Sequence, residues 1–225
     1  MSVDSPRHVI SSEFFSLDDD PASQSFSDYP YVIEALLYAS FNKILPDFEY
    51  ANVYPGEHYR LLSGLIKVLN PKLCVDIGTY RGCSARVMLD NSTENCQTYT
   101  FDIEDWKSFD WTVLKDSDFE NNKLTFIQED LGEQQVFERY IKLLSEADFI
   151  MLDGPKNDIF EELILTRLRD ANLCRKPRWL FIDDIRFPNM QKLWRRIQSP
   201  KLDLSSFGHF SGSGLVNISK GLFLE

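Results

Sequence analysis

The hydrophobic positions of this chain change their spacing repeatedly between residues 73 and 198. Short apolar runs of strand length alternate with longer stretches whose apolar residues recur at helical spacing. This alternation predicts an α/β fold in which a mostly parallel sheet has helices on both faces. We expect strands at 73–77, 97–102, 123–128, 147–152 and 178–182, and helices at 83–91, 106–115, 134–145, 158–173 and 188–198.

The regions on either side of this alternation have patterns of their own. Tyr31 to Ile44 and Gly56 to Leu69 show helical spacing, and each is followed by a proline. Near the carboxyl terminus, the pieces LDLSSF and GLVNIS flank a turn rich in Gly and Ser, which predicts an antiparallel hairpin. The runs FIML and WLFI are apolar without alternation, as expected for strands buried on both faces.

The first 28 residues differ from the rest because they are polar, rich in Ser and Asp, and lack periodicity. We interpret residues 1–28 as a flexible N-terminal arm. Residues 29–225 contain no internal repeat and no dividing linker. The sequence therefore predicts a single domain over 29–225, which is long enough to bury a sizeable core.

Composition and charge exclude some classes of partner. The chain has 24 Lys and Arg against 35 Asp and Glu, a net charge of -11, which disfavours a nucleic-acid substrate. No apolar run approaches membrane-spanning length, and no secretory signal is visible, so we expect no membrane partner. The four cysteines form no C-x-x-C pair. Buried, reduced thiols and a cytoplasmic location are the expected interpretation.

The segment LCVDIGTYRGCSARVM carries the first candidate chemistry, because it combines a strand, a glycine turn and a helix start. Gly78 permits a tight turn, and Gly82 permits close approach of a ligand or a helix. Asp76 lies at the carboxyl end of the strand, where open α/β sheets bind ligands. The pattern is neither the G-x-G-x-x-G of dinucleotide sites nor the P-loop. A generic glycine turn remains the alternative.

Acidic residues follow the next predicted strands. Asp102 comes 24 residues after Gly78, and nucleotide-binding α/β folds place a ribose-binding acid about 20 residues on. A surface acid at a strand end is the alternative. Asp153 follows the fourth strand, and Asp183 and Asp184 follow the fifth. Neighbouring parallel strands would bring these three carboxylates together, and Mg²⁺ or Ca²⁺ prefers such oxygen ligands. Helix capping can explain Asp183 or Asp184, but not Asp153.

Taken together, these segments resemble a known family. The first segment resembles the first motif of class I S-adenosylmethionine (SAM)-dependent methyltransferases, and IGTYRGCSA resembles most their small-molecule O-methyltransferase branch. MLDGPK and LFIDDI resemble the metal-dependent O-methyltransferases, most closely the sugar enzymes of the macrocin type. Catechol and caffeoyl-CoA enzymes usually show Asp-Asn, so Asp184 departs from their pattern. The resemblance covers roughly Pro55 to Ile185.

The resemblance implies a Rossmann-like, doubly wound fold with a C-terminal antiparallel hairpin, SAM as cofactor and a divalent cation such as Mg²⁺. It implies that Asp153, Asp183 and Asp184 hold the metal. Lys156 stands where the catechol-type enzymes carry a catalytic lysine, and Asp153 is the alternative base. The residues expected to contact the cofactor are Glu57, Asp76, Gly78, Thr79, Tyr80, Gly82, Ser84, Asp102, Asp130 and Asp153.

Three of the candidate residues have an equally simple alternative. Glu57 can meet the amino group of SAM or simply suit the helix dipole. Asp130 is expected beside the adenine, although short acidic runs are common. His209, in the tail turn, is either a substrate contact or an ordinary hairpin histidine.

The sequence thus predicts a SAM-dependent, metal-assisted O-methyltransferase that acts on a sugar, a glycan or a similar vicinal diol. Two alternatives stay open: a catechol-like phenol as acceptor, and a non-catalytic protein with a SAM-binding fold. The expected partner is a small-molecule or glycan acceptor. A homo-oligomer is compatible with the sequence.

Overall fold

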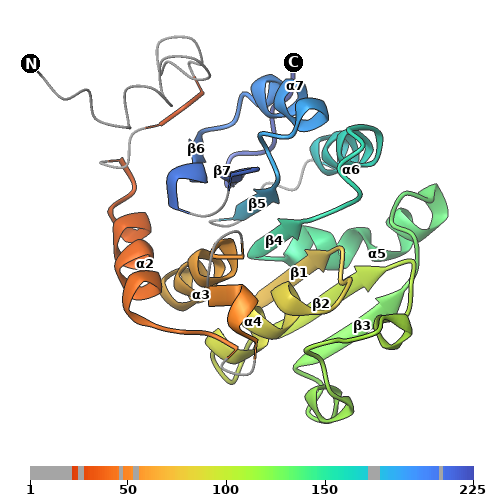
Figure 1. The fold of residues 1–225 in the computed structure, drawn as a ribbon. Coiled ribbons are helices and arrows are strands. Elements are labelled where there is room, and N and C mark those ends of the chain that lie inside the picture. The colour runs from red at the N-terminus through yellow and green to blue at the C-terminus, as the bar shows by residue number, and fades with distance from the viewer. Residues whose placement is uncertain (1–21, 25–27, 46–47, 53–55, 172–177, 208–209) are drawn as a thin grey trace, which may run out of the picture.

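The computed structural model describes residues 22–24, 28–45, 48–52, 56–171, 178–207 and 210–225. These residues form one seven-stranded sheet in the order β3-β2-β1-β4-β5-β7-β6 (Figure 1). The first five strands are parallel, and β7 pairs antiparallel with both β5 and β6. The strands are β1 (Leu73–Ile77), β2 (Gln97–Asp102), β3 (Leu124–Gln128), β4 (Phe149–Leu152), β5 (Trp179–Asp183), β6 (Lys201–Asp203) and β7 (Ser213–Asn217).

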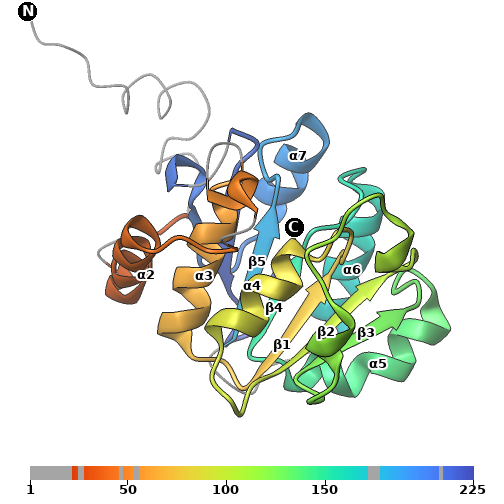
Figure 2. The ribbon, with the colours of Figure 1, turned by 60° about the horizontal axis from the view of Figure 1, so that its bottom comes forward.

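Helices cover both faces of this sheet (Figures 1 and 2). One face packs against α2 (Pro30–Phe41), α3 (His58–Leu69) and α4 (Cys83–Asn91). The other packs against α5 (Gln134–Glu146), α6 (Ile159–Asp170) and α7 (Pro188–Arg196). The predicted Rossmann-like, doubly wound architecture with its C-terminal antiparallel strands is confirmed.

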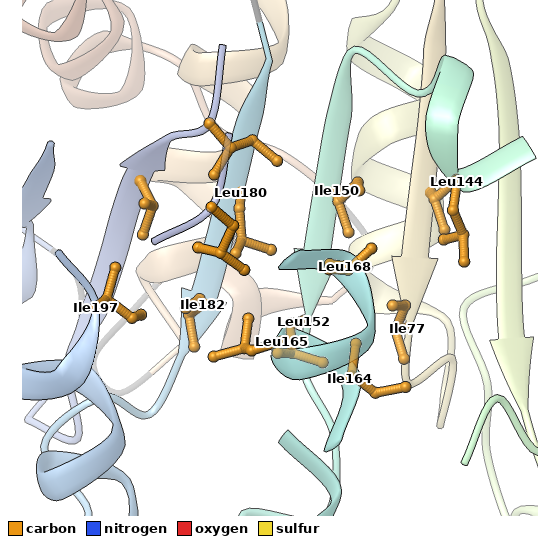
Figure 3. Packing of buried hydrophobic residues seen from close by; sticks show 14 of the residues in the cluster. Ile77, Leu144, Ile150, Leu152, Ile164, Leu165, Leu168, Leu180, Ile182 and Ile197 are labelled. Atoms are coloured by element: carbon orange, nitrogen blue, oxygen red, sulfur yellow. The ribbon is translucent and has the colours of Figure 1, made fainter. Parts of the chain in front are cut away.

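The central strands explain why their sequences are uninterrupted apolar runs. In β4, Phe149 and Met151 face the helix layer of α3, whereas Ile150 and Leu152 face the opposite layer. Successive side chains of a strand point to opposite faces, so a strand covered on both sides needs apolar residues at every position. Figure 3 shows Ile150 and Leu152 packed with residues of α6, among them Leu165.

The predicted helix at 106–115 is wrong. Only a 3₁₀ turn forms there, Trp106–Ser108, capped by the Asp105 side chain through the Lys107 N–H. Farther along, the Val113 N–H and the Thr112 hydroxyl both donate to the carbonyl oxygen of Arg81, at 3.0 Å each. These groups bond to the β1–α4 turn and not to a helix of their own.

The N-terminal arm is described only in part. Residues 1–21 and 25–27 lie outside the described residues. Residues 22–24 lie beside β6: the Gln24 N–H donates to the Lys201 carbonyl at 2.9 Å, and the Lys201 N–H donates to the Ala22 carbonyl at 3.0 Å. Among the described helices, none is both long and apolar enough to cross a bilayer.

Candidate functional site

A cavity of about 800 Å³ opens at the carboxyl ends of the parallel strands. Strand order reverses between β1 and β4, because β1–β3 extend the sheet one way and β4–β5 the other. Open α/β sheets bind ligands at this switch point, where the loops of adjacent strands diverge. Residues from β1, β2, β4 and β5 or the turns that follow them line the cavity, among them Gly78, Asp102, Asp153 and Asp183.

The turn after β1 requires glycine at position 78. Gly78 has a φ of +107°, and a Cβ on it would lie 1.9 Å from the carbonyl oxygen of Asp153. The N–H groups of Gly78 and Thr79 both donate to the Phe101 carbonyl, at 2.9 and 3.1 Å. Gly78 therefore lets the β1 turn lie directly against the turn after β4.

Gly82 is needed for a different reason than ligand approach. It has a φ of +81° and precedes α4, and a Cβ on it would lie 2.2 Å from the Cγ of Leu114. The space beside Gly82 is thus filled by a side chain of the β2–β3 connection. Gly82 is not among the residues that line the cavity.

Three further residues of the motif stabilise the turn after β1 through hydrogen bonds. The Asp76 carboxylate is fully buried, and its Oδ2 accepts hydrogen bonds from Ser84 Oγ at 3.0 Å and Thr100 Oγ1 at 2.7 Å. Thr79 Oγ1 lies 2.5 Å from Thr100 Oγ1. Asp76, Thr79 and Ser84 do not line the cavity. Their hydrogen bonds join β1, β2 and the start of α4.

Asp76 gives a prediction about stability and pH. Burial raises the pKa of Asp76 to about 7 from its ordinary 3.8, although the hydrogen bonds from Thr100 and Ser84 oppose the rise. The folded protein holds the Asp76 proton more tightly than the unfolded chain does, so protonation of Asp76 stabilises the fold. This contribution to stability is complete below pH 3.8 and is lost as the pH rises through about 7. The free energy of unfolding of the wild type, relative to that of Asp76→Asn, should therefore decrease as the pH rises from 3.8 to about 7. Urea unfolding of both proteins at several pH values measures it, and a difference independent of pH contradicts the prediction.

Asp102 ends β2 and faces the cavity. Its Oδ2 accepts the Tyr80 N–H at 2.7 Å, and its Oδ1 accepts the Glu104 N–H at 3.0 Å. These bonds fix the carboxylate between the β1 and β2 turns and leave a lone pair on each oxygen. The Tyr80 ring meets Phe109 edge to face at 4.7 Å, and both rings line the same part of the cavity.

Asp130 lines the cavity beyond β3. Its Oδ1 accepts the Gly132 N–H at 2.6 Å, which closes a short turn. The preceding Glu129 also lines the cavity and pairs with Arg139 at 2.6 Å. Asp102 and Asp130 therefore place acidic side chains along the β2–β3 end of the cavity.

Three carboxylates meet at the other end of the cavity, as the sequence predicted. One oxygen each of Asp153, Asp183 and Asp184 lies within 4.8 Å of the others. Ser213 Oγ donates to Asp183 Oδ1 at 3.3 Å, and His58 Nε2 lies 3.9 Å from Asp183 Oδ2. Burial raises the pKa of Asp153 to about 6, against the opposing charge of Lys156.

Lys156 reaches into this carboxylate cluster. Its Nζ contacts Asp153 and lies 3.4 Å from Asp184 Oδ2. Burial by itself lowers the pKa of Lys156, but the carboxylates of Asp153 and Asp183 outweigh burial and raise it above the ordinary value. Without a metal, Lys156 is thus an ammonium ion, whereas the base role expected from the sequence requires a depressed pKa.

Three residues that line the cavity have a strained backbone. Tyr80, Lys156 and Asp184 have φ values of +46°, +57° and +59°, in the left-handed region that non-glycine residues rarely occupy. All three line the cavity. Such strain persists only where surrounding contacts maintain it, and it is frequent at ligand-binding sites.

Two further predicted site residues are not found in the described lining, whereas several residues that were not predicted are. Glu57 directly precedes α3 but is not in the lining, and His209 lies outside the described residues. No pattern in the sequence indicated that His58 and several aromatic residues line the cavity, because loops and helix starts bring them there. These aromatic residues are Tyr50, Tyr59, Phe109, Phe160 and Phe210.

Several solved structures are similar to this chain. Cofactor-bound Rv0187 from MTB matches with a TM-score of 0.52 at 11% identity, over 96% of each chain. A candidate caffeoyl-CoA O-methyltransferase from Staphylococcus aureus matches with a TM-score of 0.50 at 16% identity, over 85% of this chain and 99% of that one. The O-methyltransferase TomG from Streptomyces achromogenes, in complex with SAM, has a TM-score of 0.48 at 15% identity, over 85% and 93% of the two chains.

The first two likenesses show the fold: a Rossmann-like sheet of the kind found in O-methyltransferases. No protein-family model matches the sequence, and neither does any curated protein.

Proposed function

We propose that this protein is a SAM-dependent O-methyltransferase that uses a divalent cation and acts on a sugar, a glycan or a similar vicinal diol. One observation carries the proposal. A single cavity has Asp102 at one end, the cluster of Asp153, Asp183 and Asp184 at the other, and the Gly78 turn between them. Methyl transfer needs these two half-sites side by side, because donor and acceptor react in line.

The charge of the cavity supports SAM as the cofactor. The end beyond β2 and β3 presents Asp102, Glu104 and Asp130, and among the described lining residues Lys156 is the only Lys or Arg. SAM carries a sulfonium cation and no phosphate, so an acidic surface suits it. A dinucleotide with its pyrophosphate suits this surface poorly, which argues against an NAD-dependent dehydrogenase.

The carboxylate cluster fits a hard divalent cation. Its donors are oxygen atoms only, they converge within 4.8 Å, and Asp183 and Asp184 are buried. Mg²⁺ and Mn²⁺ prefer such ligands. Asp153, Asp183 and Asp184 would hold the ion, and His58 and Ser213 would orient Asp183. When bound, such an ion lowers the pKa of a coordinated hydroxyl and orients it.

Two groups of the chain can take the acceptor's proton. Lys156 and Asp153 both line the cavity beside the cluster. Lys156 can act only when the carboxylates that now raise its pKa are neutralised by another cation. Asp153 can accept the proton if only one of its two carboxylate oxygens binds the metal ion. Both roles stay open.

The acceptor would enter beside the cluster, where Tyr50, Phe210 and Ser211 line the cavity. A vicinal diol is the first choice, because two neighbouring hydroxyls can occupy two open positions of one ion. The rings of Tyr50, Tyr59 and Phe210 favour a second candidate, a catechol-like phenol whose ring would pack among them.

Asp102 provides a direct test of the cofactor half-site. We expect Asp102→Ala to weaken SAM binding by about 1–3 kcal/mol, because the hydrogen bonds that the carboxylate would accept from the cofactor are lost. Calorimetric titration with SAM measures the change. Asp105→Ala is a matched control, since Asp105 caps the adjacent 3₁₀ turn but does not line the cavity. Unchanged affinity in folded Asp102→Ala removes Asp102 from the site.

The function itself is tested by methyl transfer. Protein, Mg²⁺ and SAM labelled on its methyl group are incubated with sugars, glycans and catechols, and with matched compounds that have an isolated hydroxyl or only an amine. The proposal expects label on acceptors with neighbouring hydroxyls. Transfer to isolated hydroxyls or to nitrogen overturns the acceptor half of the proposal. SAM binding without transfer to any acceptor of the panel favours a non-catalytic binding protein.

A further inference from the structure

The Lys156 ammonium occupies the same carboxylates that a divalent cation would use. Its Nζ contacts Asp153 and lies 3.4 Å from Asp184 Oδ2, and only 24% of the side chain is exposed. These two carboxylates, with Asp183, are the cluster that could hold a metal ion. A cation tethered to the chain therefore already lies in the place expected for the dissolved one.

The backbone of Lys156 is anchored beside the cluster. Lys156 has a φ of +57°, and its N–H donates to Oε1 of the buried Glu161 at 2.8 Å. The same oxygen would lie 2.6 Å from a Cβ on Gly154, so the loop packs tightly on Glu161. A loop anchored to the first turn of α6 thus holds the main chain of Lys156 within reach of the cluster, and the side chain is largely buried there.

We propose that the Lys156 ammonium and a divalent cation are alternative occupants of the Asp153–Asp183–Asp184 cluster, so that metal binding must displace the ammonium. This inference rests on the proposed function, because it concerns the metal site of that function. When metal is absent, Lys156 would neutralise part of the negative charge of the cluster. Lys156 would thereby weaken the affinity of the cluster for metal. A bound ion would become available to the acceptor hydroxyls only once the cation concentration is high enough to displace Lys156.

Charge explains the direction of the effect. Three carboxylates attract a cation, and one ammonium in their midst offsets a third of that charge and repels a divalent ion at close range. A neutral side chain at position 156 leaves all three carboxylates to the metal. It also leaves them to repel one another when no metal is present.

The test measures metal binding without catalysis. Mg²⁺ is titrated calorimetrically into the wild type, Lys156→Met and Lys156→Gln at one pH, without SAM or acceptor. We expect both variants to bind Mg²⁺ at least about tenfold more tightly than the wild type. They should unfold at a lower temperature than the wild type without metal, and Mg²⁺ should raise their unfolding temperature more. Lys142→Met, at an exposed position of α5, is the matched control and should behave as the wild type.

The outcomes separate this inference from the proposed function. Tighter binding in the variants supports it, including the case in which only the variants bind detectably. Equal or weaker binding in folded variants overturns it and leaves the metal-assisted function intact. If none of the proteins binds Mg²⁺ or Mn²⁺, this inference and the metal part of the proposed function both fail, whereas SAM binding, measured separately, still tests the rest. Circular dichroism checks that each variant is folded.

Discussion

Removal of divalent cations is expected to abolish methyl transfer, and addition of Mg²⁺ or Mn²⁺ to restore it. The reason lies in the cluster of Asp153, Asp183 and Asp184, three converging carboxylates whose oxygen donors suit these ions. An alcohol keeps its proton near neutral pH unless a neighbouring group lowers its pKa. Initial rates are measured with labelled SAM after exhaustive treatment with EDTA and after metal is added back.

A substitution within the cluster should reproduce the effect of the chelator. Asp183→Asn is expected to lower the turnover rate by about 100-fold or more, since even the outer partners of metal ligands contribute on that scale. SAM should still bind, because Asp183 belongs to the acceptor end of the cavity. Glu94→Gln changes an exposed carboxylate and is the control. Full activity in the chelated enzyme or in Asp183→Asn would leave these carboxylates as bases or helix caps.

Replacing Gly78 with alanine is the second change expected to have a large effect. The added Cβ would lie 1.9 Å from the Asp153 carbonyl, at a φ of +107° that alanine adopts only under strain. Backbone strain and overpacking together should lower the free energy of unfolding by about 2–4 kcal/mol. Because the β1 and β4 turns would be pushed apart, SAM affinity should fall at least about tenfold.

Urea unfolding and calorimetric titration with SAM measure the two effects of Gly78→Ala. Gly221→Ala is the matched control, because Gly221 has a φ of +111° and does not line the cavity. It should lose stability through strain and keep its SAM affinity. If Gly78→Ala binds SAM as the wild type does, the close approach of the two turns is not what forms the site.

The sheet could be predicted from the sequence because its local signals and its tertiary environment agree. The expected ranges 73–77 and 97–102 coincide with β1 and β2. FIML and WLFI showed their burial on both faces through the absence of alternation. The convergence of Asp153, Asp183 and Asp184 followed from the rule that consecutive parallel strands are usually neighbours. These inferences needed only periodicity and strand order.

Features that depend on contacts between distant residues could not be predicted. In the segment 106–115, where we expected a helix, the Thr112 hydroxyl and the Val113 N–H donate to the distant Arg81 carbonyl. The sequence of the segment itself contains no sign of these contacts. Lys201 is buried, since its ammonium donates to the Trp194 and Ile197 carbonyls at the end of α7. The contact of the Lys156 ammonium with the carboxylates likewise depends on the loop conformation. A sequence pattern gives residue types at strand ends, whereas the direction of each side chain depends on its partners.

We propose that the cavity lined by the Gly78 turn and the carboxylate cluster binds SAM. Calorimetric titration of the metal-free wild type with SAM tests it most directly, with S-adenosylhomocysteine and NAD as competitors. We expect one SAM site per chain, competition by S-adenosylhomocysteine, no competition by NAD, and weaker binding in Asp102→Ala. Folded protein that shows no binding at millimolar SAM, or SAM binding that Asp102→Ala and Gly78→Ala leave unchanged, would contradict it.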